Sequence, residues 1–203
     1  MKLFFHYCSF GFSNCYVLGE KKNSDAIIID PGDMEENILE CIESNEFNLK
    51  AVFVTHDHIG HVHGLRTLQR IYDIEVYAIN RQVMGSETTL VKDGDRIEIG
   101  SFDIEVISIP GHSSDSAVFL VNRRLLFTGD VLTSGLVGST DSAYGESTQM
   151  SKLRSRLLSL PGDYTVFPGH GPPSTLEAER RFNVSINSYN EKRSRRPLFK
   201  LDF

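Results

Sequence analysis

Four histidines lie close together in one short segment of the chain. His56, His58, His61 and His63 fall within eight residues, directly after the apolar run 51–54. Neutral imidazole is a common protein ligand of zinc, iron, nickel and copper. Because open α/β sites gather their ligands at the carboxyl ends of strands, this spacing predicts several imidazoles on one loop at such an end. The alternative is a group of solvent-facing histidines.

Three other apolar runs end at a turn that carries a further candidate metal ligand. The turns are Pro110-Gly111-His112, Thr128-Gly129-Asp130 and Pro168-Gly169-His170. Glycine next to each candidate lets the backbone turn sharply and come close to a bound ion. Each one alone is an ordinary turn residue. Together with the histidine segment, the three predict a single metal site.

Strands and helices of recognisable pattern must position these side chains. Apolar or β-branched runs between turn residues predict strands over residues 15–18, 26–29, 51–54, 75–79, 96–99, 102–109, 117–121, 124–127 and 164–167. Apolar residues that share one face predict helices over residues 34–44, 62–71, 151–160 and 176–187. Many strands with interspersed helices are typical of a layered α/β or α+β fold in which helices cover sheets.

Composition limits the class of protein. The chain has 203 residues, 21 Lys+Arg against 27 Asp+Glu, a net charge of −6 and 40% hydrophobic residues. These values predict one globular domain over residues 1–203, large enough to bury a core without structural metal or disulfides. The acidic balance argues against a nucleic-acid partner. No run reaches the roughly 18 apolar residues of a membrane span, and no signal-peptide pattern is present, so no membrane association is expected.

The cysteines and the basic C-terminal run carry no catalytic signal. Cys8, Cys15 and Cys41 cannot all pair within one chain and show no C-x-x-C spacing. They favour a reducing compartment, so a cytoplasmic protein is expected. The run 191–196 is basic, and residues 188–203 are expected to form a short solvated tail. The sequence does not fix the oligomeric state.

In order and spacing, these motifs resemble those of the metallo-β-lactamase-fold hydrolase superfamily. The pattern is most similar to the small glyoxalase II-like (hydroxyacylglutathione hydrolase-like) branch and runs from Asn14 to about Asn183. The matching segments are Asn14-Cys15-Tyr16-Val17, Ile29-Asp30-Pro31-Gly32, Thr55-His56-Asp57-His58-Ile59-Gly60-His61, Pro110-Gly111-His112, Phe127-Thr128-Gly129-Asp130 and Phe167-Pro168-Gly169-His170-Gly171-Pro172. The resemblance implies an α/β fold, a four-layer αββα sandwich with the site at one edge between the sheets.

The resemblance also implies a set of metal ligands. His56, His58 and His112 would hold a first ion, and Asp130 would bridge and orient the attacking hydroxide. His61 and His170 would help to hold a second ion.

One position departs from the pattern of the family. The family motif reads His-x-His-x-Asp-His, but Gly60 stands at the aspartate position, so the usual aspartate ligand of the second ion is missing. Asp57 lies between two histidines that must point at the first ion, so its side chain is expected to face away. His63 is an alternative ligand, although a solvent-facing role at the start of a helix is favoured. We therefore expect one ion, or two bound unequally.

Zinc is the predicted metal, with iron and manganese as alternatives because a mixed nitrogen and oxygen ligand set accepts several ions. The resemblance implies a hydrolase in which metal-bound hydroxide attacks a carbonyl carbon, since the ion lowers the pKa of water from about 15.7 toward 7. The expected substrate is a small thioester, ester or lactone. Ser139 stands where related proteins often have arginine, and few residues follow His170, whereas glyoxalase II has a longer helical region that binds glutathione. Both features argue against a glutathione conjugate.

Three other functions compete with this hypothesis. A mononuclear site also suits an iron-dependent persulfide dioxygenase, which would take up oxygen. A nonenzymatic metal-binding module would fit if Gly60 marks a loss of activity. A nuclease of the same fold is disfavoured because the chain is acidic and has no room for an added substrate-clamping domain.

Overall fold

Two six-stranded sheets form the centre of the protein in a computed structural model that describes residues 1–21 and 24–194. The first sheet has the order β1 (Lys2–Tyr7), β2 (Asn14–Gly19), β3 (Asp25–Ile29), β4 (Asn48–Phe53), β5 (Glu75–Ala78) and β8 (Thr89–Leu90). The second has the order β14 (Ser174–Thr175), β13 (Thr165–Pro168), β12 (Leu125–Gly129), β11 (Ala117–Val121), β10 (Phe102–Ser108) and β9 (Arg96–Ile99). Strands β6 (Gln82–Val83) and β7 (Ser86–Glu87) form a separate hairpin.

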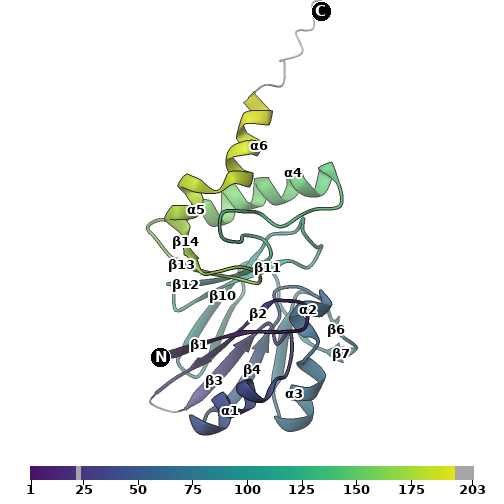
Figure 1. Cartoon of the computed structure of the whole chain (residues 1–203), viewed down its shortest axis with the longest axis vertical. Helices are drawn as coiled ribbons and strands as arrows, with labels where there is room; N and C mark the ends of the chain where they lie inside the picture. Colours follow the sequence, from purple (N-terminus) through teal and green to yellow (C-terminus); the bar gives the residue numbers. More distant parts are fainter. Residues whose placement is uncertain (22–23, 195–203) are drawn as a thin grey trace, which may run out of the picture.

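Helices cover the outer face of each sheet (Figure 1). On the first sheet lie α1 (Glu36–Ser44), the short α2 (Ile59–Val62) and α3 (Leu65–Ile71). On the second lie α4 (Ala143–Lys152), which continues as a π-helix over Leu153–Leu158, then α5 (Leu176–Phe182) and α6 (Val184–Ser194). The predicted four-layer αββα sandwich is therefore confirmed.

Alternation along each strand divides the core into three layers. In β3, Ile27 and Ile29 face the second sheet, whereas Ala26 and Ile28 face the helices of the first sheet. In β10, Ile104 packs between the sheets while Ile107 belongs to the cluster under α4 and α5. Strands buried on both faces read as continuous apolar runs, which is why the sequence revealed them so clearly.

Some predicted boundaries were wrong. Strand β1 was not predicted because it lies at a sheet edge, where Phe5 and Tyr7 are about half exposed and the pattern is only partly apolar. The predicted helix 62–71 is divided at Gly64, whose position leaves no space for a side chain against the backbone of Asp33. The predicted helix 151–160 starts earlier, because Ser142 caps α4 by accepting a hydrogen bond from the Gly145 backbone.

The structure describes only part of the tail predicted over residues 188–203. Residues 188–194, assigned to the basic tail, continue α6, and residues 195–203 lie outside the described residues. Among the described residues, no helix is long and apolar enough to cross a membrane. Cys8 and Cys15 are free and fully buried, and Cys41 is free and partly buried.

Candidate metal centre

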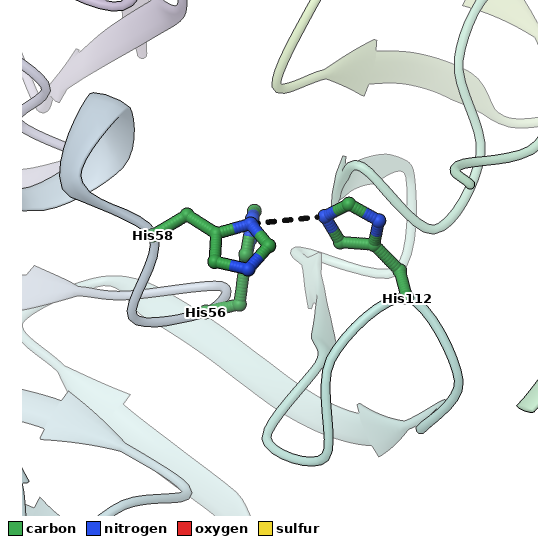
Figure 2. A group of neighbouring side chains, drawn as sticks. All are labelled: His56, His58 and His112. Atoms are coloured by element: carbon green, nitrogen blue, oxygen red, sulfur yellow. Dashed lines mark hydrogen bonds between the residues drawn. The ribbon is translucent and has the colours of Figure 1, made fainter. Parts of the chain in front are cut away.

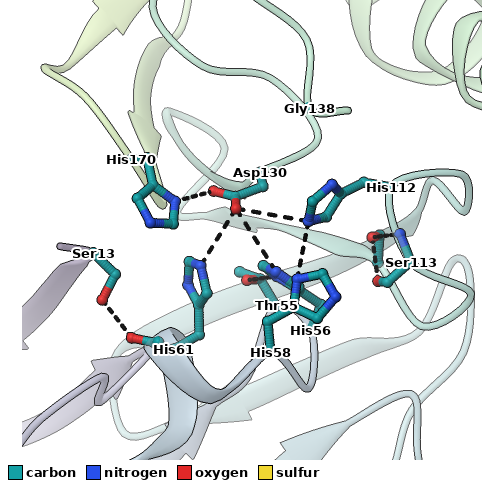
Figure 3. Close-up of polar contacts among 12 residues, drawn as sticks. Ser13, Thr55, His56, His58, His61, His112, Ser113, Asp130, Gly138 and His170 are labelled. Carbon is teal, nitrogen blue, oxygen red and sulfur yellow. Dashed lines mark hydrogen bonds and ion pairs between the residues drawn. The ribbon is translucent and has the colours of Figure 1, made fainter. Parts of the chain in front are cut away.

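All six predicted ligand residues meet at one edge of the sandwich, where strands from both sheets end (Figure 3). His56 and His58 follow β4, and His61 lies in α2. The other three, His112, Asp130 and His170, follow β10, β12 and β13. Backbone hydrogen bonds join the sheets here, from Ala117 N to Thr55 O at 2.8 Å and from Asn14 N to Gly169 O at 2.7 Å. The two halves of the site are thus held in fixed relation.

His56, His58 and His112 form the first group that could hold an ion (Figure 2). His112 Nε2 lies 3.1 Å from His58 Nδ1, so two ring nitrogens from different sheets face each other. Asp130 Oδ2 lies 3.8 Å from His56 Nε2 and 3.7 Å from His112 Nε2. Donor atoms this close, directed at one space from different elements, suit a tetrahedral ion such as zinc.

His56, His61 and Asp130 form a second, overlapping group. His61 Nε2 lies 3.5 Å from Asp130 Oδ2. The Nε2 atoms of His56 and His61 are both buried and have no hydrogen-bond partner among the described residues. Buried polar atoms nearly always have a partner, and an unpaired one requires an explanation. A metal ion satisfies both nitrogens, so these residues fit the ion that the sequence predicts.

Asp30 orients the rings of His56 and His61, the first through Thr55 and the second directly. The Asp30 side chain is buried, and its Oδ2 accepts hydrogen bonds from His61 Nδ1 at 3.0 Å and from Thr55 Oγ1 at 2.6 Å. Because the Thr55 hydroxyl donates to Asp30, it is left to accept from His56 Nδ1, which lies 3.1 Å away. Each ring therefore turns its Nε2 toward the space for an ion, an arrangement typical of metal sites, and His61 would release its Nε2 proton when an ion binds. The sequence analysis assigned Asp30 and Thr55 no role; the available signal was a carboxylate directly after the buried strand β3.

The charges of the site are strongly coupled. Burial of His56 lowers its pKa to about 2, which keeps the ring neutral. Burial also disfavours the charged form of His61, but the carboxylates of Asp130, 3.5 Å from its Nε2, and of Asp30, hydrogen-bonded to its Nδ1, outweigh burial and raise the pKa of His61 to about 10. For Asp130, burial opposes ionisation, yet the hydrogen bond from His170 and the nearby ring of His61 hold the pKa of Asp130 well below its usual value. Without an ion, Asp130 is thus a carboxylate between cationic rings.

His170 is held differently from the other ligand candidates. Its Nδ1 donates to Asp130 Oδ1 at 2.7 Å and its Nε2 donates to the Gly11 carbonyl oxygen at 3.1 Å. The hydrogen bond with Asp130 raises the pKa of His170, so both nitrogens act as donors. Asn14 fixes this loop, because its Nδ2 donates to the carbonyl oxygens of Pro168 and Gly171. To bind an ion, His170 would have to give up one of its two hydrogen bonds.

The β1–β2 loop packs directly on Gly60. A Cβ added at Gly60 would lie 3.3 Å from Gly11 Cα, and one added at Gly11 would lie 2.5 Å from Gly60 Cα. Ser13 Oγ also donates a hydrogen bond to the Gly60 carbonyl oxygen. The backbone of Gly11 therefore covers the position from which an aspartate side chain would start.

Asp57 and His63 lie outside both groups. The Asp57 side chain is exposed, and its backbone nitrogen donates to Asp115 Oδ2 at 2.9 Å. The His63 ring stacks on Phe10 with 4.1 Å between ring centroids, and its Nδ1 faces Asp33 Oδ1 at 3.6 Å. Both side chains are exposed, and neither belongs to a ligand group.

Replacing Asp30 by Asn should weaken metal binding by about 10- to 100-fold, since partners that orient a ligand histidine contribute about this much to affinity. The amide keeps the shape of the side chain but removes the charge that holds His61 Nδ1–H. Competition with a chromogenic chelator measures the change, and Asp33→Asn, next to the surface ring of His63, is the matched control. An unchanged Kd for Asp30→Asn would show that Asp30 only stabilises the fold.

Comparisons with known proteins agree with this geometry. The family model described as "Metallo-beta-lactamase superfamily" matches residues 8–170. Hydroxyacylglutathione hydrolase GloC of Haemophilus influenzae is 29% identical over 198 residues, covering 86% of this chain and 93% of that protein. A hydroxyacylglutathione hydrolase of Francisella tularensis is 34% identical over 158 residues, covering 76% of this chain and 61% of that protein. The crystal structure of ETHE1 from Myxococcus xanthus superposes with a TM-score of 0.82 at 25% identity, covering 97% of this chain and 92% of that one.

Proposed function

Because the chain belongs to the metallo-β-lactamase superfamily, we propose that it is a metal-dependent hydrolase of a small acyl substrate, a thioester, ester or lactone. One observation carries the proposal: two buried imidazole nitrogens without partners, on His56 and His61, converge with His112 on one carboxylate oxygen of Asp130. Similarity to hydroxyacylglutathione hydrolases supports the acyl class of substrate.

In this proposal His56, His58 and His112 would hold the ion, and Asp130 would supply the neighbouring carboxylate. A divalent ion bound there supplies a water of lowered pKa and a Lewis acid for the carbonyl oxygen. Asp130 stays ionised at neutral pH; its Oδ1 accepts from His170, and its Oδ2, which faces His56, His61 and His112, would orient a water held by the ion. Ser139 fixes the ring of His112, since its carbonyl oxygen accepts from His112 Nδ1 at 2.8 Å.

The test of this function is turnover by metal-free protein to which zinc, manganese or iron(II) is added separately. The assay panel contains thioesters, lactones and a glutathione thioester. We expect hydrolysis that depends on the added ion and is unchanged in His63→Ala, whose ring lies outside the ligand groups. A protein that binds metal and hydrolyses none of these substrates would instead be the nonenzymatic metal-binding module.

Protein purified without added metal should carry about one ion per chain. The His56–His58–His112 group offers three histidines, whereas the site of the second ion lacks the additional aspartate that the family has at the position of Gly60. Zinc is the expected ion, and iron or manganese are the alternatives. Elemental analysis gives the ratio. Two tightly held ions per chain would contradict the prediction.

Gly60→Asp provides the matched comparison. The backbone at Gly60 is not in the left-handed region, so an aspartate is allowed there, although Gly11 must shift by a few tenths of an ångström to admit its Cβ. We expect the variant to bind a second ion more tightly than the natural chain does. Unchanged occupancy would mean that the missing carboxylate does not limit the second site.

An iron-dependent persulfide dioxygenase is the second candidate. It is favoured by the group of two histidines and one carboxylate, His56, His61 and Asp130, since this ligand type is characteristic of mononuclear iron oxygenases. Oxygen uptake by iron-loaded protein with glutathione persulfide distinguishes the two functions, because a hydrolase consumes no oxygen.

A further inference from the structure

A cavity of about 480 Å³ lies beside the ligand cluster, between the loop after Val137, the first turns of α4 and the side of α6. Gly138 and Ser139 form the wall that the cavity shares with the cluster. The Ser139 carbonyl oxygen accepts the hydrogen bond from His112 Nδ1, and a Cβ added at Gly138 would lie 3.1 Å from the same nitrogen. The cavity therefore adjoins the ring of one ligand residue, His112, across this wall.

A buried amide in the cavity lining has an acceptor atom without a donor. Gln149 is fully buried, and its Nε2 donates to the carbonyl oxygens of Val131 and Gly138, both at 3.4 Å. These two contacts fix which end of the amide is the nitrogen. The Gln149 Oε1 atom is then left with no hydrogen-bond partner among the described residues. Buried acceptor atoms nearly always have a donor, so this oxygen is a candidate to accept a hydrogen bond from a bound ligand.

Two carboxylates add negative charge to the same lining. Asp141 and Glu146 line the cavity, and neither forms an ion pair with any described residue. No lysine or arginine lines it within the described part of the chain. Arg154 lies 5.1 Å from the ring centroid of Tyr189 and donates to Asn190, and it is not a lining residue.

The amino terminus of α4 contributes a partial positive charge that is smaller than the negative charge of the two carboxylates. A helix amino terminus carries roughly half an elementary charge, and the first turn of α4 already holds Glu146 and the Ser142 cap. Two full negative charges therefore outweigh it, and a hollow lined by one sign of charge concentrates ligands of the other sign. The side chains of Val137, Met150 and Tyr189 supply apolar contact for the carbon atoms around such a group.

Resting on the hydrolase function above, we propose that this cavity binds the ammonium end of the substrate. The substrate class is then a small ester or thioester whose alcohol or thiol part carries a protonated amine, with its N–H directed at Gln149 and its charge between Asp141 and Glu146. This assignment differs from an anionic glutathione conjugate, for which the cavity offers no cation among the described residues.

A matched pair of substrates tests the proposal on metal-loaded protein. S-[2-(dimethylamino)ethyl] thioacetate is protonated at pH 7, and S-(3-methylbutyl) thioacetate replaces its N–H by C–H without charge. We expect kcat/KM to be about tenfold higher for the ammonium substrate, from one charge-assisted hydrogen bond and two partly exposed ion pairs. In the Asp141→Asn, Glu146→Gln double variant the ratio of the two kcat/KM values should fall to about one.

Glu36→Gln, Glu40→Gln is the control variant, because it makes the same change of net charge on α1, which packs on the other sheet. It should keep the tenfold ratio. Equal hydrolysis of the two substrates by the natural chain, or faster hydrolysis of the anionic 3-(acetylthio)propanoate, would overturn the proposal and leave the hydrolase function intact.

A binding measurement separates this proposal from the hydrolase function. Ligand-observed NMR with 2-(dimethylamino)ethyl methyl sulfide, which cannot be hydrolysed, needs no turnover. We expect the amine to bind the natural chain and not the double variant. The uncharged 3-methylbutyl methyl sulfide should bind neither protein. If the amine binds in this way but no thioester is hydrolysed, the hydrolase function fails and the ammonium site stands. Absence of amine binding contradicts the site whatever the activity.

Discussion

His58→Ala and His112→Ala should each lower kcat/KM by more than about 100-fold. Losing a residue that merely orients a metal ligand costs 10- to 100-fold, so losing the ligand itself costs more. The two rings face each other at 3.1 Å from different sheets, and neither has a neighbour that could replace it within the first group. The metal-dependent thioester assay and the metal content of each variant are the measurements.

The same series tests whether the two ligand groups are unequal. His61→Ala should cost less than either first-group variant, since His61 serves the group that Gly60 has already deprived of a carboxylate. His63→Ala should cost nothing. Equal and complete loss on replacing His61 would show that both ions are required for turnover.

Asp130→Asn should abolish activity and also destabilise the metal-free protein by about 1–3 kcal/mol, the usual cost of removing one partner of a buried hydrogen bond, since His61 keeps Asp30 as a partner. Asp130 lies between His61 and His170, and its carboxylate favours the protonated form of both rings, through a hydrogen bond to His170 and through its charge 3.5 Å from His61 Nε2. The isosteric amide preserves packing and removes the charge. Urea unfolding of metal-free protein gives the difference, and the exposed Asp73→Asn is the control.

The pH dependence of that difference follows from the shifted pKa values. The lowered pKa of Asp130 contributes stability above about pH 3.8, which is lost as the pH falls further. The raised pKa of His61 contributes stability below about pH 6.5, which is lost as the pH rises toward 10. The gap between natural chain and variant should therefore be widest between about pH 4 and 6.5. A gap that is constant from pH 4 to 10 would mean that the charges are not coupled.

Most of the sandwich could be predicted because its strands are buried on both faces and interrupted by clear turns. Ile27, Ile28 and Ile29, for example, serve two different cores and so form an unbroken apolar run. Edge strand β1 lacks this signal, since half-exposed aromatic residues alternate there with partly buried ones. The second helix is divided where the Gly64 N–H donates at 2.9 Å to the carbonyl oxygen of Pro31, a residue that lies far from it in the sequence.

The ligand residues could be predicted for a related reason. Five of them follow a strand within a few residues and His61 lies in the short α2 just after, so the position of each depends on a few neighbouring residues. The hydrogen bond from His61 to Asp30 and the packing of Gly11 on Gly60 instead join distant segments. Gln149 could not be identified either, because its unpaired oxygen depends on where the loop at Gly138 folds.

The division of the ligands between the two sheets makes the centre sensitive to their alignment. Three of the six residues come from each sheet, and the donor atoms that face one another across the junction are 3.1 to 3.8 Å apart. One residue of slippage along a strand is a displacement of about 3.3 Å. A shift of one sheet against the other by a single residue would therefore displace a donor atom by about as much as the distance that separates it from the donor atoms of the other sheet. A bound ion would therefore stabilise the correct alignment of the two sheets. A protein that retains its ion would have both sheets in register.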